Sequence, residues 1–98
     1  MNITHIFELP CYDSRKSFYG KAHVLEDSNG NIYLQSYNTI VCYMDKSGHF
    51  HRLWGGYSAT TQRHINSFII EYRLSNSYAG KKYWESMEVE TVWQKNTL

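Results

Sequence analysis

The chain has 98 residues, a length that one hydrophobic core can serve, so we expect a single globular domain over residues 1–98. Its formal net charge is only +1, which excludes a strong overall field for attracting phosphates or an anionic membrane surface. With 42% hydrophobic and 19% charged residues the composition is that of a globular chain, and no apolar run reaches the length of a membrane-spanning helix.

The N-terminal stretch NITHIFELP predicts either a short edge strand or an arm that Pro10 closes, and residues 11–16 are typical of a turn. The stretch lacks the basic and apolar regions of a signal peptide, so we expect a reduced, cytoplasmic protein. Cys11 and Cys42 belong to no CxxC motif. Because Cys42 lies in an apolar run, we expect it to be an inert packing residue with a raised thiol pKa.

The Asn29-Gly30 pair lies between two β-rich runs, and this pair favours a two-residue type I′ turn. We therefore predict an antiparallel hairpin of residues 17–26 and residues 31–44. Apolar and aromatic side chains occupy both alternating sets of the second run, which indicates a register change through a bulge near Ser36-Tyr37-Asn38.

A turn over residues 45–48 leads into a third predicted strand, HFHRLWGG, and Gly55-Gly56 then lets the chain turn before an N-cap at Ser58. The helical periodicity that follows predicts a helix over residues 59–73. Its buried face is expected to contain Thr61, Ile65, Phe68, Ile69 and Tyr72. The fold class is therefore α+β, a three-stranded antiparallel β-meander followed by an amphipathic helix packed across the sheet (β-β-β-α).

The C-terminal part carries weaker patterns. KKYWESME favours a short second helix, and VETVW favours either an extended tail or a last strand. We interpret Glu85, Glu88 and Glu90 as a solvated helix face with local ion pairs, because such faces are far commoner than paired-carboxylate sites.

The chain contains no motif that predicts catalysis. His49 and His51 form an HxH on a strand, but a metal site needs three or four ligands, so we interpret them as partly exposed strand histidines. We therefore expect no enzyme, no catalytic residue, no metal and no other cofactor.

The start of the helix is a candidate anion site, because free amides and the helix dipole there favour negative charge. GGYSATTQ lacks the lysine of a GxxxxGK[ST] phosphate loop, so a turn and a cap are the simpler interpretation. If a small anionic nucleotide were bound here, the ligating residues would be Ser58, Thr60, Thr61, Arg63 and His64.

Sixteen residues in every hundred are aromatic, more than the core of a small domain can hide, which favours a binding surface. Ile70 projects nearly opposite Ile65, onto the polar side of the helix near Arg63, which suggests a protein contact there. An alternative surface is the sheet face, where aromatic side chains would stack on bases. Its predicted residues are Tyr33, Tyr37, Tyr43, Arg52 and Trp54.

SFYGKAHV, LQSYNTIV and GYSATTQRHINSF resemble a family of small uncharacterised proteins from bacteriophages and bacterial mobile elements. The helix start matches its Y-S-x-T-T-x-R-H-I-x-x-F signature, and the resemblance covers residues 17–72. RLWGGYSATTQ is also similar in outline to β-β-β-α DNA-binding domains, although the predicted strands carry only Lys21 and Arg52 as basic residues.

The phage resemblance implies a protein of the host-cell cytoplasm. We expect a non-enzymatic binding module that acts stoichiometrically on a host or phage macromolecule, such as an anti-CRISPR-like antagonist of host defence. A protein partner is expected first. Nucleic acid bound by a β-β-β-α domain, or a nucleotide sequestered at the helix start, is the alternative; no membrane partner is expected, and a homodimer is compatible with the sequence.

Overall fold

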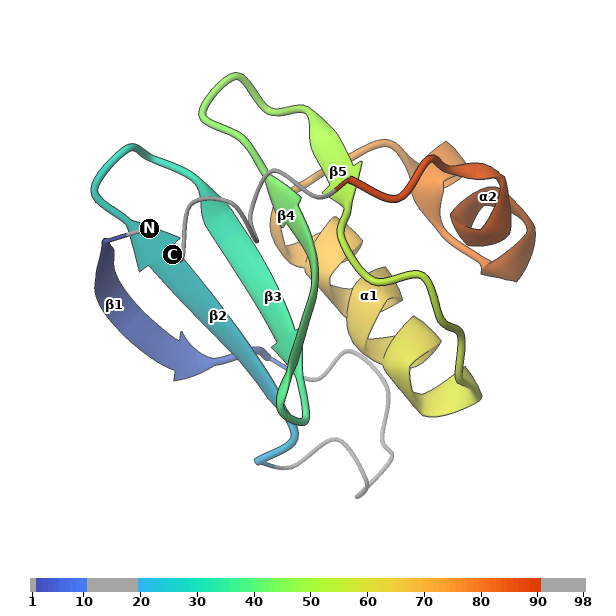
Figure 1. The fold of residues 1–98 in the computed structure, drawn as a ribbon, viewed down its shortest axis with the longest axis horizontal. Helices are drawn as coiled ribbons and strands as arrows, with labels where there is room; N and C mark the ends of the chain where they lie inside the picture. Colours follow the sequence, from blue (N-terminus) through green and yellow to red (C-terminus); the bar gives the residue numbers. More distant parts are fainter. Residues whose placement is uncertain (1, 11–19, 91–98) are drawn as a thin grey trace.

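The computed structural model describes residues 2–10 and 20–90 of the chain (Figure 1). Its elements are β1 (Ile3–Glu8), β2 (Ala22–Asp27), β3 (Ile32–Ser36), β4 (Thr39–Met44), β5 (Phe50–Arg52), α1 (Ala59–Glu71), the 3-10 helix η2 (Asn76–Tyr78) and α2 (Lys81–Ser86). The strands form one antiparallel sheet in the order β1-β2-β3-β4-β5, and α1 crosses one of its faces. No helix among the described residues has the length and apolar character needed to cross a membrane. The fold is α+β, with five strands where we predicted three.

The predicted single strand over residues 31–44 is wrong, because the chain reverses at Tyr37-Asn38 and forms two paired strands, β3 and β4. Tyr37 adopts a positive φ of 55°, which is uncommon for a residue with a bulky side chain. Its amide donates to the carbonyl of Lys21 at 2.7 Å, which supports the turn. No glycine occurs at this turn, so the sequence had no local signal for the β3–β4 hairpin. A separate register shift follows in β4, where the Val41 carbonyl accepts from two consecutive amides.

The N-terminal stretch was predicted to be either an edge strand or an arm, and the structure shows an edge strand. β1 pairs with β2, and a register shift between Ile3 and His5 leaves Thr4 as a bulge. The predicted strand over residues 17–26 corresponds to β2. Its first residues, the predicted turn at residues 11–16 and Cys11 lie outside the described part. The predicted turns at Gly30 and Gly48 are confirmed, each glycine having a φ of +88°, but the first is not the predicted two-residue type I′ turn, which needs a positive φ at both central residues, because Asn29 does not have one.

The main hydrophobic core lies between α1 and the sheet. Its fully buried members include Leu34, Val41, Ile65, Phe68, Ile69 and Trp84. The predicted core positions Ile65 and Phe68 are confirmed, and Tyr72 packs against them while partly buried. Ser58 caps α1 as predicted, its hydroxyl accepting from the amide of Thr61 at 3.0 Å. A smaller cluster of Leu25, Tyr33 and Leu53 forms a second buried group.

The end of the described chain covers the outer side of β5. The predicted second helix is confirmed as α2, whose Trp84 is 1% exposed. Val89 then pairs in parallel with Arg52, and the Glu90 amide donates to the Arg52 carbonyl at 2.8 Å. The predicted tail continues past residue 90 and lies outside the described residues.

Gly56 is a point of close approach in this region. Its carbonyl accepts a hydrogen bond from the Trp84 indole at 2.9 Å. A Cβ at Gly56 would collide with the indole ring of Trp54, whereas a Cβ at Gly55 would meet only Val89 at 3.7 Å.

Candidate protein-binding surfaces

The residues predicted to hold an anion at the start of α1 are largely engaged in the fold. Ser58 caps the helix. The hydroxyl of Thr61 lies 2.9 Å from that of Ser36, which in turn lies 2.8 Å from Nδ1 of His64. Thr61 and His64 are both buried, and their contacts with Ser36 join α1 to β3. Thr60 and Arg63 remain partly exposed, and the structure does not gather the five predicted residues around a common ligand.

The predicted nucleic-acid face is divided between the two sides of the sheet. Tyr33 packs in the smaller cluster, and Tyr43 packs against that cluster. Trp54 packs against the main core instead, and Tyr37 lies at the exposed turn between β3 and β4. Arg52 contacts the ring of Trp84, a main-core residue, with its guanidinium carbon 4.6 Å from the ring centroid. These five residues therefore do not form one stacking platform.

Arg52 was predicted to lie on the nucleic-acid-binding face, but it is buried. Only 5% of the residue is exposed, and its guanidinium donates to the carbonyls of Trp54 at 2.8 Å and Trp84 at 2.7 Å. Two longer hydrogen bonds reach the carbonyls of Met87 and Gly56. Burial lowers the pKa of Arg52. A basic residue that looked available for phosphate instead joins β5 to the α2 region.

His51 is the centre of a titratable cluster. Its Nδ1 lies 2.7 Å from a carboxylate oxygen of Glu90, and its Nε2 lies 2.8 Å from one of Asp45. Both nitrogens must donate to satisfy two carboxylates, so this geometry requires the imidazolium. Burial opposes the charge, but the hydrogen bonds to Asp45 and Glu90 outweigh it and raise the pKa of His51. The His51 hydrogen bond, with two backbone amides, lowers the pKa of Asp45 to about 2.

This cluster corrects two sequence interpretations. Glu90 lies beyond α2 and forms an ion pair with His51, rather than belonging to a solvated helix face. His49 precedes β5 instead of lying in it, and its side chain is 74% exposed, with its Nδ1 3.6 Å from the same Asp45 oxygen that His51 contacts. Within residues 2–10 and 20–90, no three His, Cys, Asp or Glu side chains are placed to hold a metal ion. Cys42 is a fully buried free thiol, and burial raises its pKa well above the ordinary value, as predicted.

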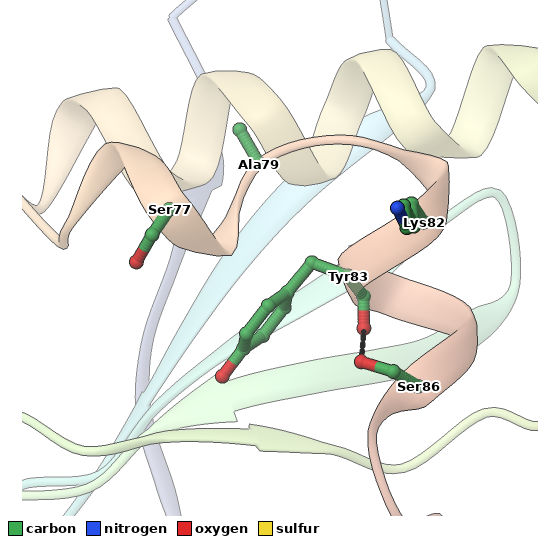
Figure 2. Close-up of a pocket in the computed structure, with 5 residues that line it drawn as sticks. All are labelled: Ser77, Ala79, Lys82, Tyr83 and Ser86. Carbon is green, nitrogen blue, oxygen red and sulfur yellow. Dashed lines mark hydrogen bonds between the residues drawn. The ribbon is translucent and has the colours of Figure 1, made fainter.

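A hollow of about 420 Å³ lies between η2 and α2, lined by Ser77, Ala79, Lys82, Tyr83 and Ser86 (Figure 2). The Ser86 hydroxyl donates to the Tyr83 carbonyl at 2.7 Å and is therefore already engaged. Figure 2 shows the five side chains spread along the hollow instead of converging on one point. Lys82 supplies the only charge among these lining residues.

Two further surfaces among the described residues expose large apolar side chains. The first, the helix surface, consists of Thr60, Arg63 and Ile70 on α1, with Ile70 51% exposed. The second, the edge surface, consists of residues 5–8 in β1, where Ile6 is 64% and Phe7 is 39% exposed. Sequence reasoning identified the helix surface from Ile70. It predicted an edge strand or an arm for this stretch but did not identify Ile6 and Phe7 as a surface, because no local pattern showed that their side chains would stay exposed.

A family model matches most of the chain. A model described as a family of unknown function (DUF8033) matches residues 7–86. Among curated proteins and among solved structures, nothing matches the chain. The matched residues run from β1 to the end of α2, which is most of the described fold. The chain therefore belongs to the DUF8033 family of unknown function.

Proposed function

We propose that the chain is a non-enzymatic binding module that acts stoichiometrically on another protein, which it contacts through the helix surface. The observation that supports this most directly is Ile70, which is 51% exposed on a helix where Phe68 and Ile69 are fully buried. The exposed half of this side chain contributes nothing to folding, whereas a partner that covers it would gain the transfer free energy of that remaining apolar surface.

The neighbours of Ile70 suit such a contact. Arg63 lies two helical turns earlier on the same side of α1 and is partly exposed. Arginine is enriched at protein interfaces, and a few anchors beside it commonly supply most of the binding free energy. Thr60 adds a hydroxyl on the same side, one turn before Arg63. The surface therefore combines an apolar anchor with polar groups at its rim.

The reactive side chains of the described residues favour binding over catalysis. His64 is fully buried against Ser36, and His51 is held between two carboxylates. Cys42 is fully buried, where desolvation disfavours the thiolate that a nucleophile requires. The resemblance to bacteriophage proteins adds a setting, in which the bound protein belongs to the host and an anti-CRISPR-like antagonism of host defence is the role we propose.

The test is retention of a partner by matched variants. Immobilised wild type, Ile70→Asp and Lys82→Gln are incubated with bacterial lysate, and the bound proteins are quantified by mass spectrometry. Lys82→Gln changes the net charge by the same single unit as Ile70→Asp, but in the hollow beside α2. We expect one protein to be retained in near-equimolar amount by wild type and Lys82→Gln and lost from Ile70→Asp. Equal retention by Ile70→Asp would contradict the assignment to the helix surface.

Nucleic-acid binding is tested on the same samples. With a net charge of +1 and Arg52 buried, few phosphates can be neutralised, so we expect negligible retention of DNA or RNA at roughly 150 mM salt. Sub-micromolar binding that weakens steeply with added salt would contradict a protein partner and favour the nucleic-acid alternative.

A further inference from the structure

The outermost strand, β1, has a backbone that is paired on one side only among the described residues. The Leu9 amide donates to the Ala22 carbonyl at 3.0 Å, and Phe7 and His5 follow in the same register opposite Val24 and Glu26. In an antiparallel pair, alternate residues exchange hydrogen bonds with the neighbouring strand while those between them face away. The amides and carbonyls of Ile6 and Glu8 therefore face outward.

From this edge we propose that two copies of the chain associate by pairing their β1 strands antiparallel about a two-fold axis, with Ile6 opposite Ile6. A two-fold pairing of this kind joins residues that point to the same face, so only same-parity registers are allowed. The Ile6-centred register places His5 opposite Phe7 and Thr4 opposite Glu8. Each exposed apolar side chain then meets an apolar or aromatic one, and no like charges face each other.

The competing registers are less complementary. A register centred on His5 places two imidazoles opposite each other, which repel when protonated. A register centred on Phe7 places Ile6 opposite the Glu8 carboxylate, so an apolar group would cover a charged one. The Ile6-centred register also lets the outward-facing amide and carbonyl of Ile6 exchange both hydrogen bonds with the second copy.

A second copy fits this edge better than open-ended stacking. Head-to-tail growth would need a free outer side on β5, but Val89 and the Glu90 amide already occupy it. The Thr4 bulge and Pro10 also limit the regular edge to a few residues, which disfavours long pairing. A two-fold pair uses both β1 edges and leaves none open, so the assembly stops at a dimer.

The pairing has a consequence for the proposed function, although it does not depend on it. A two-fold axis perpendicular to the sheet leaves both α1 helices on the same side of a continuous ten-stranded sheet, twice the five strands of one copy. The dimer would therefore present two helix surfaces to one side, which suits a partner that is itself symmetric or repeated.

The experiment measures mass against concentration by analytical ultracentrifugation. A strand pair this short buries less than the roughly 1,200 Å² of a standard interface, so we expect the wild type to pass from monomer to dimer between about 10 µM and 1 mM. Ile6→Lys should weaken association at least about tenfold, because two ammonium groups then face each other. Ile70→Lys, an equally charged change at another exposed isoleucine, should leave association unchanged. Circular dichroism confirms that both variants remain folded.

Cross-linking tests the register in a Cys11→Ser background. Paired Cα atoms about 5.5 Å apart are within disulfide range, so Ile6→Cys should form a disulfide-linked dimer on mild oxidation. Phe7→Cys and Ile70→Cys should form markedly less. A wild type that stays monomeric to about 1 mM, or equal cross-linking by Ile70→Cys, would overturn the dimer. Since partner retention depends on Ile70 and dimerisation on Ile6, failure of one proposal is distinguishable from failure of the other.

Discussion

The two edges of the sheet differ in whether the described part of the chain covers them. β5 has only three residues, and its outer side is covered by the chain itself through Val89, with Arg52 and Trp84 joining the same contact. β1 has six residues, five of them exposed, and nothing among the described residues pairs with its outer side. A sheet edge must be shortened, covered or made unattractive to other strands. This fold covers β5 internally and leaves β1 available for an intermolecular contact.

The largest expected difference between the edges is in core packing. Trp84→Ala should lower the free energy of unfolding by about 3–5 kcal/mol, because a fully buried indole is replaced by a cavity. Phe7→Ala in β1 should cost less than about 1.5 kcal/mol, since 39% of Phe7 is already in water. Urea unfolding followed by circular dichroism measures both. Similar losses for the two variants would mean that β1 is held as firmly as the α2 region.

Arg52→Met should come next, with a loss of about 2–4 kcal/mol, because the carbonyls of Trp54 and Trp84 lose their donor in a buried site. Arg52→Lys should recover only part of this loss, since one ammonium cannot reproduce the planar guanidinium fork. The same unfolding experiment measures both variants. If Arg52→Met were as stable as wild type, the covered edge would depend on Trp84 alone.

The His51 cluster gives the covered edge a dependence on pH. The pKa of His51 is raised above the ordinary 6.5, so its contribution is complete below about pH 6.5 and is lost as the pH rises through the folded-state value. The Asp45 pKa of about 2 means that the carboxylate's contribution is present above its ordinary 3.8 and is lost only in acid. We expect wild type to be less stable at about pH 8.5 than at about pH 5.5 through this cluster.

His51→Gln is the control for that pH effect, because an amide does not titrate in this range. Thermal unfolding at the two pH values should show a smaller difference for His51→Gln than for wild type. An unchanged difference would assign the pH dependence to another group.

The smallest expected effect is that of Ile6→Lys on the isolated protein. At a concentration where the chain is monomeric, the free energy of unfolding should change by no more than about 0.5 kcal/mol, as for most exposed positions. Chemical unfolding of dilute samples measures it. A loss of several kcal/mol would show that Ile6 packs against the monomer's own core and is therefore not available for an intermolecular contact.

The parts of the fold that the sequence predicted are those with local signals. Gly30 and Gly48 form their turns through the positive φ that glycine readily adopts, and Ser58 needs only the amide one turn later. The turn at Tyr37-Asn38 was missed because its positive φ belongs to a tyrosine, and the surrounding pairing has to impose it. Local backbone preference therefore predicted two turns and missed the third.

The candidate surfaces also differ in whether a local signal or a long-range contact determines them. Ile70 could be found from helical periodicity alone. The burial of Arg52 and the pairing of His51 with Glu90 depend on contacts 32 and 39 residues apart, which no local periodicity reports. An edge position for β1 was one of two predicted states, and only the order of the whole sheet decides between them. Sequence patterns show which residues share a face, but they do not show what covers that face.

Gly55 and Gly56 look interchangeable in the sequence, and a saturation mutagenesis library would separate them. Alanine at Gly55 should survive selection for folded protein, because its added methyl meets only Val89 at an ordinary contact distance. Alanine at Gly56 should be depleted, because the indole of Trp54 would have to move off the main core to make room for it. A substitution at Gly56 that is depleted on its own should be recovered when Trp54 is replaced by a smaller residue. Substitutions at these two positions should therefore occur together among variants that remain folded.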